Sequence, residues 1–372
     1  MPSTFYTSFN PNPWGVLTPL TRCRADRHLR LLRALTGLFG LLIVLSGCGG
    51  GPIVPTATGR FLYVATSSGI YGFSIMSTGT LSPLSTQPLV QNTGLFQIAA
   101  TPGIPAGQSG PLLLGATGDS SVSVWTVGGG GSLTQTTPIG CSGSSGLGAI
   151  TGLAVTSDSQ YLVVVDGNSG GGSSSSDNLG LISFSKTSSC ETGYTSASTS
   201  TYPVQPAIDC AVSGTSPCIL FLTVSTTSLS TSLNLETPQE IPVTLSSTPP
   251  FGSHSSSAYT CTPPNCPLGA TFDPTTVFFY ASFTGTNPPS LQSIAPQAKS
   301  AASQVSFPPT APLNYPCVDT LGGIVYTPTS NGFLYASPTN SSGGLSGPTT
   351  VLSPSSLPVS LDMLSCAVVS NP

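Results

Sequence analysis

Short apolar runs rich in aromatic and β-branched residues recur along the chain after residue 58. Each run is flanked by Gly, Ser, Asn or Asp, and no stretch there keeps a helical period. The runs begin about 48 to 58 residues apart, at Phe61–Ala65, Leu112–Ala116, Tyr161–Val165, Ile219–Val224, Val277–Ala281 and Ile324–Tyr326. A self-similar period of this length is typical of solenoids, propellers and arrays of small units.

The order of segments inside each unit also repeats. The first run of a unit is followed in the sequence by a segment of alternating polarity, as in Ile70–Ile75, Val122–Val127, Leu181–Ser185 and Gly332–Tyr335. Three units continue with Gly-x-Leu, and a further strand is expected before the runs, at Gly152–Val155, Asp209–Val212 and Leu268–Thr271. Four short strands joined by turns predict one blade of a β-propeller.

The two ends of the repeat region complement each other. The first unit has no strand before Phe61, whereas Leu361–Val369 has the character of that missing strand, and its Cys-Ala-Val echoes Cys210–Val212. We therefore expect residues 59–372 to form one all-β domain, a β-propeller of about six blades, or seven, closed by the C-terminal strand. Tandem immunoglobulin-like sandwiches are the alternative, but their units are nearer about 100 residues long.

The first two units resemble a known family. Gly59–Thr66, Ile70–Ile75 and Thr78–Pro83 are similar to the repeat of lactonase-type β-propellers related to 6-phosphogluconolactonase, and the similarity weakens after about residue 200. The resemblance implies a propeller and, by analogy, hydrolysis of a sugar-derived lactone. Members of that family usually have seven blades, and none of their catalytic residues matches a motif here.

The N-terminal region has the features of an export signal. An apolar run, Ala34–Leu45, follows Arg22, Arg24, Arg27, Arg30 and Arg33 and ends in Leu45-Ser46-Gly47-Cys48. The run is shorter than the roughly 20 residues of a membrane-spanning helix, so a cleaved signal is favoured over an uncleaved anchor.

The four residues at the end of that run resemble the lipobox of bacterial lipoproteins. We expect residues 1–47 to be a lipoprotein signal peptide and residues 48–58 a linker acylated at Cys48. The resemblance implies an exported protein held to the cell envelope by its lipid. Gly49 rather than Asp follows the cysteine, which favours the outer membrane or the cell surface.

The charge that remains after residue 47 excludes one class of partner. The chain holds 8 Lys and Arg and 12 Asp and Glu, and removal of five arginines and Asp26 leaves 3 bases against 11 acids, or −8. Nucleic-acid binding requires several phosphate contacts from basic residues, so we expect none. The membrane is expected to be reached through the lipid and not through surface charge.

Eight cysteines follow Cys48, namely Cys141, Cys190, Cys210, Cys218, Cys261, Cys266, Cys317 and Cys366. An even set in an exported chain predicts disulfides, among which Cys210–Cys218 and Cys261–Cys266 are close enough for local bridges. Cys141–Cys190 and Cys317–Cys366 each span 49 positions, close to the repeat length. A zinc site is the competing interpretation, but no Cys-x-x-Cys occurs and His254 is the only histidine after residue 47. We expect no metal and no cofactor.

Few residues offer catalytic chemistry. His254 lies in a serine-rich loop and Arg60 precedes a strand, so we expect structural positions for both. Asp209, Asp319 and Asp362 fall in or just before predicted innermost strands, where three carboxylates could converge on the channel and bind calcium or a cationic ligand. Isolated capping of strand ends is the simpler interpretation of these aspartates.

Two functions fit these observations. The first is an envelope-anchored binding or scaffold module for a protein or glycan partner, which the scarcity of ionisable side chains favours over an enzyme. The second is a lactonase-like hydrolase. The fold of the repeat is specific, but it does not determine an activity.

Overall fold

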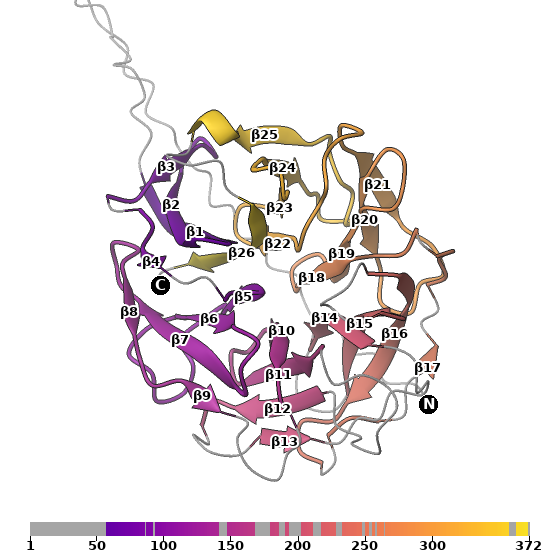
Figure 1. The fold of residues 1–372 in the computed structure, drawn as a ribbon, viewed down its shortest axis with the longest axis horizontal. Helices are drawn as coiled ribbons and strands as arrows, with labels where there is room; N and C mark the ends of the chain where they lie inside the picture. The colour runs from indigo at the N-terminus through magenta and orange to yellow at the C-terminus, as the bar shows by residue number, and fades with distance from the viewer. Residues whose placement is uncertain are drawn as a thin grey trace, which may run out of the picture. The chain divides into compact units, whose positions relative to one another are not determined.

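Antiparallel sheets are arranged in a ring around a common centre in the computed structural model of the protein (Figure 1). The structure describes residues 57–372 except 86, 92–93, 141–146, 168–178, 186–189, 193–201, 211–216, 228–232, 248–249, 253–254, 257–258, 264, 357–361 and 371–372. The predicted signal peptide, Cys48 and the linker as far as residue 56 therefore lie outside the described residues. Within the described ranges, no helix is long and apolar enough to cross a membrane.

The first three sheets are each built on a path of four strands, written here from the channel outward. Blade 1 consists of β26 (Met363–Ser370), β1 (Ala57–Thr66), β2 (Gly69–Met76) and β3 (Leu81–Pro83), with β4 (Val90–Gln91) also paired to β2. Blade 2 consists of β5 (Gln97–Ala100), β6 (Leu112–Ala116), β7 (Ser121–Val127) and β8 (Leu133–Gln135), with β9 (Ile139–Gly140) also paired to β7. Blade 3 consists of β10 (Ile150–Val155), β11 (Tyr161–Asp166), β12 (Leu179–Ser183) and β13 (Cys190–Thr192).

The other three sheets follow the same plan. Blade 4 consists of β14 (Tyr202–Asp209), β15 (Cys218–Ser225), β16 (Leu235–Val243) and β17 (Ser255–Ser256). Blade 5 consists of β18 (Gly269–Asp273), β19 (Phe278–Phe283), β20 (Ser290–Ile294) and β21 (Ser303–Ser306). Blade 6 consists of β22 (Cys317–Asp319), β23 (Ile324–Pro328), β24 (Leu334–Pro338) and β25 (Thr349–Leu352), and a 3-10 turn, η1 (Pro354–Ser356), follows it. The described residues thus form the six-bladed propeller expected from the repeat.

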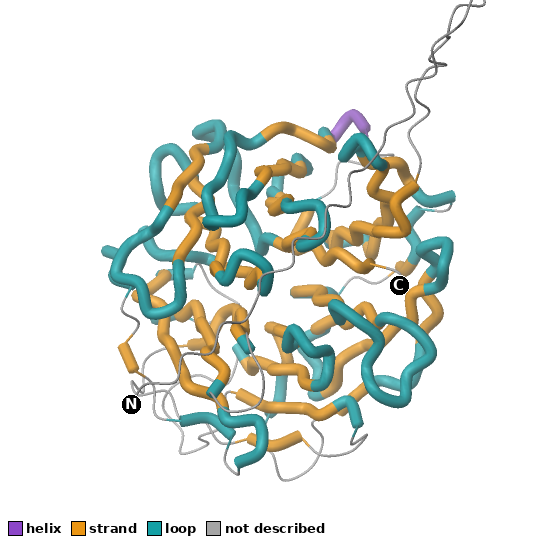
Figure 2. Tube along the Cα trace, turned by 180° about the vertical axis from the view of Figure 1, so that it is seen from behind, coloured by secondary structure: helices purple, strands orange, loops and turns teal. Residues whose placement is uncertain are grey.

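Burial explains why the second strand of each blade gave the clearest signal in the sequence. The six apolar runs coincide with β1, β6, β11, β15, β19 and β23, which have a neighbouring strand on both sides and a neighbouring blade on both faces. All five residues of β6 are buried. The outermost strands are more exposed, as in β8, where no residue is fully buried. Figure 2 shows the loops that join the strands at the periphery of the ring.

The hydrophobic core lies between blades and not inside a single sheet. One cluster joins Leu62 and Tyr71 of blade 1 to Tyr326 and Leu334 of blade 6. Another joins Tyr63 of the first blade to Trp125 of the second. Because every blade is covered by two neighbours, the apolar faces can be buried completely only when the ring is closed.

The C-terminal strand closes the ring as expected. β26 pairs antiparallel with β1, with Tyr63 opposite Ala367 and Val64 opposite Cys366. At the seam with blade 6, Tyr315 forms a parallel bridge with Ser365. The Asn314 side chain donates a hydrogen bond to the Met363 carbonyl at 2.6 Å. The two ends of the repeat region therefore meet in one sheet.

Three of the predicted cysteine pairs are bonded in the structure. Cys210–Cys218 and Cys261–Cys266 are local bridges with separations of 8 and 5 residues. Cys317–Cys366 joins β22 to β26 across the seam between the last and the first blade. Cys141 and the side chain of Cys190 lie outside the described residues, so their pairing stays a prediction.

The expected inner strand of blade 4 was wrong. We placed it at Asp209–Val212, but the structure has β14 at Tyr202–Asp209, so Asp209 ends the strand and Cys210 follows it. Pro203 and Pro206 concealed this strand, because proline cannot donate to a sheet ladder. An innermost strand tolerates proline, since only one of its edges pairs within the blade.

The closure can be tested by removing β26. We expect a chain ending at Pro358 to aggregate, or to melt far below the intact protein, because the deletion removes the ladder to β1 and exposes the apolar faces of blades 1 and 6. A chain ending at Ser370 is the control. Thermal unfolding followed by circular dichroism measures both, and normal melting of the Pro358 chain would show that ring closure is dispensable.

Candidate functional site

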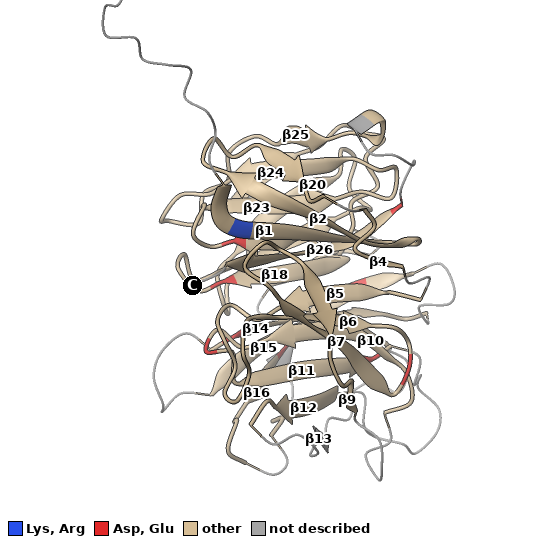
Figure 3. Ribbon diagram, turned by 90° about the vertical axis from the view of Figure 1, so that its left-hand side faces the viewer, with Lys and Arg blue, Asp and Glu red and all other residues tan. Residues whose placement is uncertain are grey.

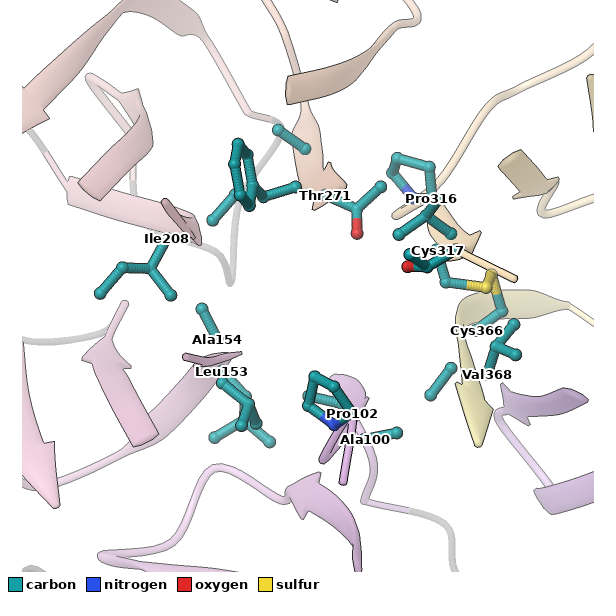
Figure 4. Close-up of a pocket in the computed structure, with 18 of the residues that line it drawn as sticks. Ala100, Pro102, Leu153, Ala154, Ile208, Thr271, Pro316, Cys317, Cys366 and Val368 are labelled. Atoms are coloured by element: carbon teal, nitrogen blue, oxygen red, sulfur yellow. A yellow bond between two sulfur atoms is a disulfide. The ribbon is translucent and has the colours of Figure 1, made fainter. Parts of the chain in front are cut away.

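The inner strands of all six blades surround a pocket of about 280 Å³ in the central channel (Figure 4). Residues of β5, β10, β14, β18, β22 and β26 line it. The pocket continues past the ends of these strands to the turns that follow them, at Pro102, Ser157, Pro274 and Thr320–Leu321. Each blade therefore contributes its innermost strand to one shared site.

The described residues that line this pocket carry no ionisable side chain apart from the disulfide-bonded cysteines. Aliphatic and aromatic groups predominate, among them Leu153, Ile208, Phe272 and Val368. Hydroxyl groups are supplied by Ser157, Thr271, Thr320 and Ser370. Both cysteines of the Cys317–Cys366 bridge are also part of the wall. The described wall of the pocket is thus uncharged and largely apolar.

Two buried glutamines in the wall join neighbouring blades. Gln97 of β5 accepts a hydrogen bond from the Leu153 amide at 2.7 Å and donates one to the Leu153 carbonyl at 3.1 Å. Gln205 of β14 accepts a hydrogen bond from the Ala270 amide at 2.9 Å. In both cases a side-chain amide pairs with the main chain of the next inner strand, much as a strand neighbour would.

Other polar groups around the channel also form hydrogen bonds between neighbouring blades. The Ile98 amide of β5 donates to the Ser365 hydroxyl of β26 at 2.9 Å, which joins blades 2 and 1. Thr223 of blade 4 donates to the Leu268 carbonyl, beside β18, at 3.0 Å. Gly269 allows the Gln205 side chain to reach β18, because a Cβ at residue 269 would collide with the Gln205 amide oxygen and the Tyr315 ring. Burial raises the pKa of Tyr315 to about 12.

The three carboxylates expected at the channel do not line the pocket. Asp319, at the end of β22, is fully buried and forms an ion pair with Arg60 of β1. Asp209 is buried at the end of β14. Asp362 is exposed just before β26, and partial desolvation raises the pKa of its carboxyl. Within the described residues, no group of His, Cys, Asp and Glu is arranged to hold a metal ion.

Arg60 was expected just before a strand, but it lies within β1 (Ala57–Thr66). Its guanidinium reaches from blade 1 to Asp319 of blade 6, and its side chain is 16% exposed. The Asp319 carboxylate also accepts a hydrogen bond from the Gly322 amide at 3.0 Å. This ion pair therefore ties the same two blades as the Cys317–Cys366 disulfide. His254, the other candidate side chain, lies outside the described residues.

The Tyr326 hydroxyl of β23 lies near this ion pair and is buried. Burial and the negative charge of Asp319 raise its pKa, while Arg60 lowers it. Within the described residues, this hydroxyl has no hydrogen-bond partner. A buried hydroxyl without a partner lowers stability and supplies no chemistry by itself.

The two glutamines and the uncharged lining of the pocket were not expected from the sequence. A signal was present, because Gln97-Ile-Ala-Ala and Gln205-Pro-Ala-Ile each place one glutamine before three apolar residues. A glutamine in an otherwise apolar inner strand indicates a buried amide that must find main-chain partners. Both glutamines lie in the innermost strand of their blade, at Gln97 in β5 and Gln205 in β14. An innermost strand has one edge that is not paired within its own blade, so the main-chain partners of these amides are expected in the neighbouring blade.

Comparisons with known proteins find similarity at the level of solved structures. No protein-family model matches the chain, and no curated protein matches it. A protein from Lactobacillus plantarum is 13% identical with a TM-score of 0.45, covering 77% of this chain and 80% of its own.

Two further structures have similar values. A putative 6-phosphogluconolactonase from Bacteroides uniformis is 12% identical with a TM-score of 0.47, covering 77% of this chain and 81% of its own. A functionally unknown protein from Desulfotomaculum acetoxidans is 14% identical with a TM-score of 0.42, covering 77% of this chain and 78% of its own. The described residues define the protein as a six-bladed β-propeller, and the side chains they place around its central pocket are uncharged.

Replacement by phenylalanine is expected to change the free energy of unfolding in opposite directions at two buried tyrosines. Tyr326→Phe removes the unpartnered hydroxyl and should raise the free energy of unfolding by about 1 kcal/mol. Tyr63→Phe, the matched control, removes a hydrogen bond of 2.9 Å to the Gly131 carbonyl and should lower it by about 1 kcal/mol. Urea unfolding measures both, and equal losses would show that the Tyr326 hydroxyl is satisfied.

Proposed function

We propose that the protein is an exported, lipid-anchored β-propeller that serves as a binding or scaffold module for a protein or glycan partner. The observation that carries this proposal is the neutral wall of the channel. Acid–base catalysis needs a titratable group within hydrogen-bond reach of the substrate. The described residues around the pocket supply no such group, which argues against catalysis in the channel and leaves the outer surface of the ring to meet a partner.

Two observations support export. The three disulfides of the described residues are a type of bond that forms in extracytoplasmic compartments and is rare in the cytosol. The apolar run and Leu45-Ser46-Gly47-Cys48 have the pattern of a lipoprotein signal. Two or more acyl chains would hold the protein stably at a membrane, whereas a single chain gives only reversible binding.

The surface favours recognition without strong electrostatic attraction. Charged residues amount to 5% of the chain, and Figure 3 shows scattered acidic positions on this side of the ring and a basic position at β1. Charge complementarity mainly accelerates association and rejects wrong partners. A surface of hydroxyl, amide and small apolar groups instead suits a glycan or a neutral protein face. The outer membrane or the cell surface would provide both.

The second candidate is a lactonase-like hydrolase, which the sequence of the first two blades favours. Such an enzyme would need an acid or base and donors for an oxyanion. Asp319, one of the three expected channel carboxylates, is held in the ion pair with Arg60, so Asp209 and Asp362 are the positions tested below. The two functions are separated by one experiment.

The mature chain with Cys48→Ala, purified as a soluble protein, should bind isolated envelope glycan or one envelope protein and should not hydrolyse lactones. Sedimentation with the glycan and chemical crosslinking to the protein measure binding, and base consumption measures hydrolysis of a lactone panel. Asp209→Asn and Asp362→Asn serve as controls. Lactone turnover that these variants abolish would replace the binding function by the enzyme.

The anchor has its own test. Radiolabelled palmitate should label the wild-type protein in its host, and Cys48→Ala should abolish the label and leave the protein unprocessed or released from membranes. Cys23→Ala is the matched control and should keep the label, since Cys23 lies inside the expected signal peptide. Absence of label in the wild type would refute lipid anchoring.

A further inference from the structure

We propose that the pocket in the central channel binds an uncharged aliphatic ligand, such as a short saturated chain with a neutral polar end. This site is separate from the surface proposed above for a protein or glycan partner. The proposal uses only lining residues that the structure describes, and it does not depend on lipid anchoring. The proposal rests on the character of the wall, on the use already made of its polar groups, and on the size of the pocket and its mouth.

The wall matches a hydrocarbon chain. Side chains from different blades, including Ile208, Leu153 and Val368, surround the pocket in Figure 4. Transfer of a methylene group from water to such a site is favourable, and each added methylene should tighten binding about fourfold until the pocket is full. A ligand of this kind gains affinity from every part of the wall without needing a specific polar partner.

The glutamine oxygens of the wall are already used within the propeller, so a sugar would have mainly the wall's hydroxyls as partners. Both ends of the Gln97 amide pair with Leu153, and the Gln205 oxygen pairs with Ala270. A glycan or a sugar lactone would bury several hydroxyls here, and each buried hydroxyl without a partner would weaken binding. The pocket therefore discriminates against the polyhydroxylated ligands that the sequence resemblance brought forward.

A charged ligand is disfavoured for a related reason. The lining residues that the structure describes include no side chain of opposite charge for a carboxylate or an ammonium group. The ion pair of Arg60 and Asp319 is closed on itself. Burial of an unpaired charge is strongly unfavourable. A fatty alcohol or a neutral ester should consequently bind better than the corresponding fatty acid anion.

The size and the mouth agree with a short chain. The volume of about 280 Å³ is close to the lower end of small-molecule sites, which run from roughly 300 to 1,000 Å³. Leu321, in the turn after β22, belongs to the lining and is 73% exposed. Ser157 and Ser370 lie near the same ends of their strands and offer hydroxyls to a neutral polar end. The chain would enter the channel while its polar end stays at the mouth.

The first measurement is a homologous series of primary alcohols, from butanol to decanol, titrated calorimetrically into the mature chain with Cys48→Ala. We expect affinity to rise about fourfold per methylene and then to level off as the pocket fills. Octanoate should bind at least tenfold more weakly than octanol, and glucose should not compete. An affinity that does not depend on chain length, or competition by glucose, would overturn the proposal.

A size-matched pair of variants tests the location. Thr271 lines the pocket in β18 (Figure 4). Thr271→Asp places a carboxylate in the wall and should weaken octanol binding tenfold or more, whereas Thr271→Val should bind as well as the wild type or better. Circular dichroism and melting temperature verify that both fold. Equal octanol binding by a folded Thr271→Asp and by Thr271→Val would exclude the channel.

A blocking variant supplies an independent readout. Ala154→Phe fills part of the channel and should shorten the longest alcohol that gains affinity. Ala106→Phe is its control, since Ala106 is exposed and does not line the pocket. Unchanged chain-length dependence in a folded Ala154→Phe would contradict the site. Failure of glycan or protein binding would leave all these results intact, so the two proposals can fail separately.

Discussion

The pairing of β26 with β1 is the constraint on which the rest of the structure depends. A propeller blade buries its apolar faces only between two neighbours, so an open array would leave two faces in water. Here the last strand of the chain enters the first sheet and completes its ladder. The Cys317–Cys366 disulfide and the Arg60–Asp319 ion pair then join blade 6 to that same sheet. A backbone ladder, a covalent bond and a buried charge pair thus converge at one seam.

The three connections contribute differently to that seam. The disulfide restricts the unfolded chain, and its loop of 49 residues makes this effect substantial, at roughly 4 kcal/mol in the chain-entropy view. The ion pair contributes little net stability when intact, because two charges must leave water. Loss of either partner, however, leaves the other charge buried, at a cost of about 3–5 kcal/mol. The pair therefore specifies which blades meet more than it strengthens their contact.

The sequence predicted those parts of the fold that leave a continuous apolar signal. Second strands such as Leu112–Ala116 are buried along their whole length, and the structure has them at the expected residues. The inner strand of blade 4 was misplaced, because Pro203 and Pro206 interrupt its pattern on an edge that needs no second partner. Asp319 fell at the end of an inner strand as expected, but no pattern along the chain shows that Arg60, 259 residues away, reaches it.

The neutrality of the channel follows from the way in which the ring is held together. Inner strands have one unpaired edge, and Gln97, Gln205 and Ser365 direct their polar atoms to the neighbouring strand's main chain. Each such bond strengthens contact between blades and removes a polar group from the channel. Asp319 is likewise drawn into the seam by Arg60 and away from the pocket. The interactions that close the propeller therefore leave apolar side chains as the main surface offered to a ligand.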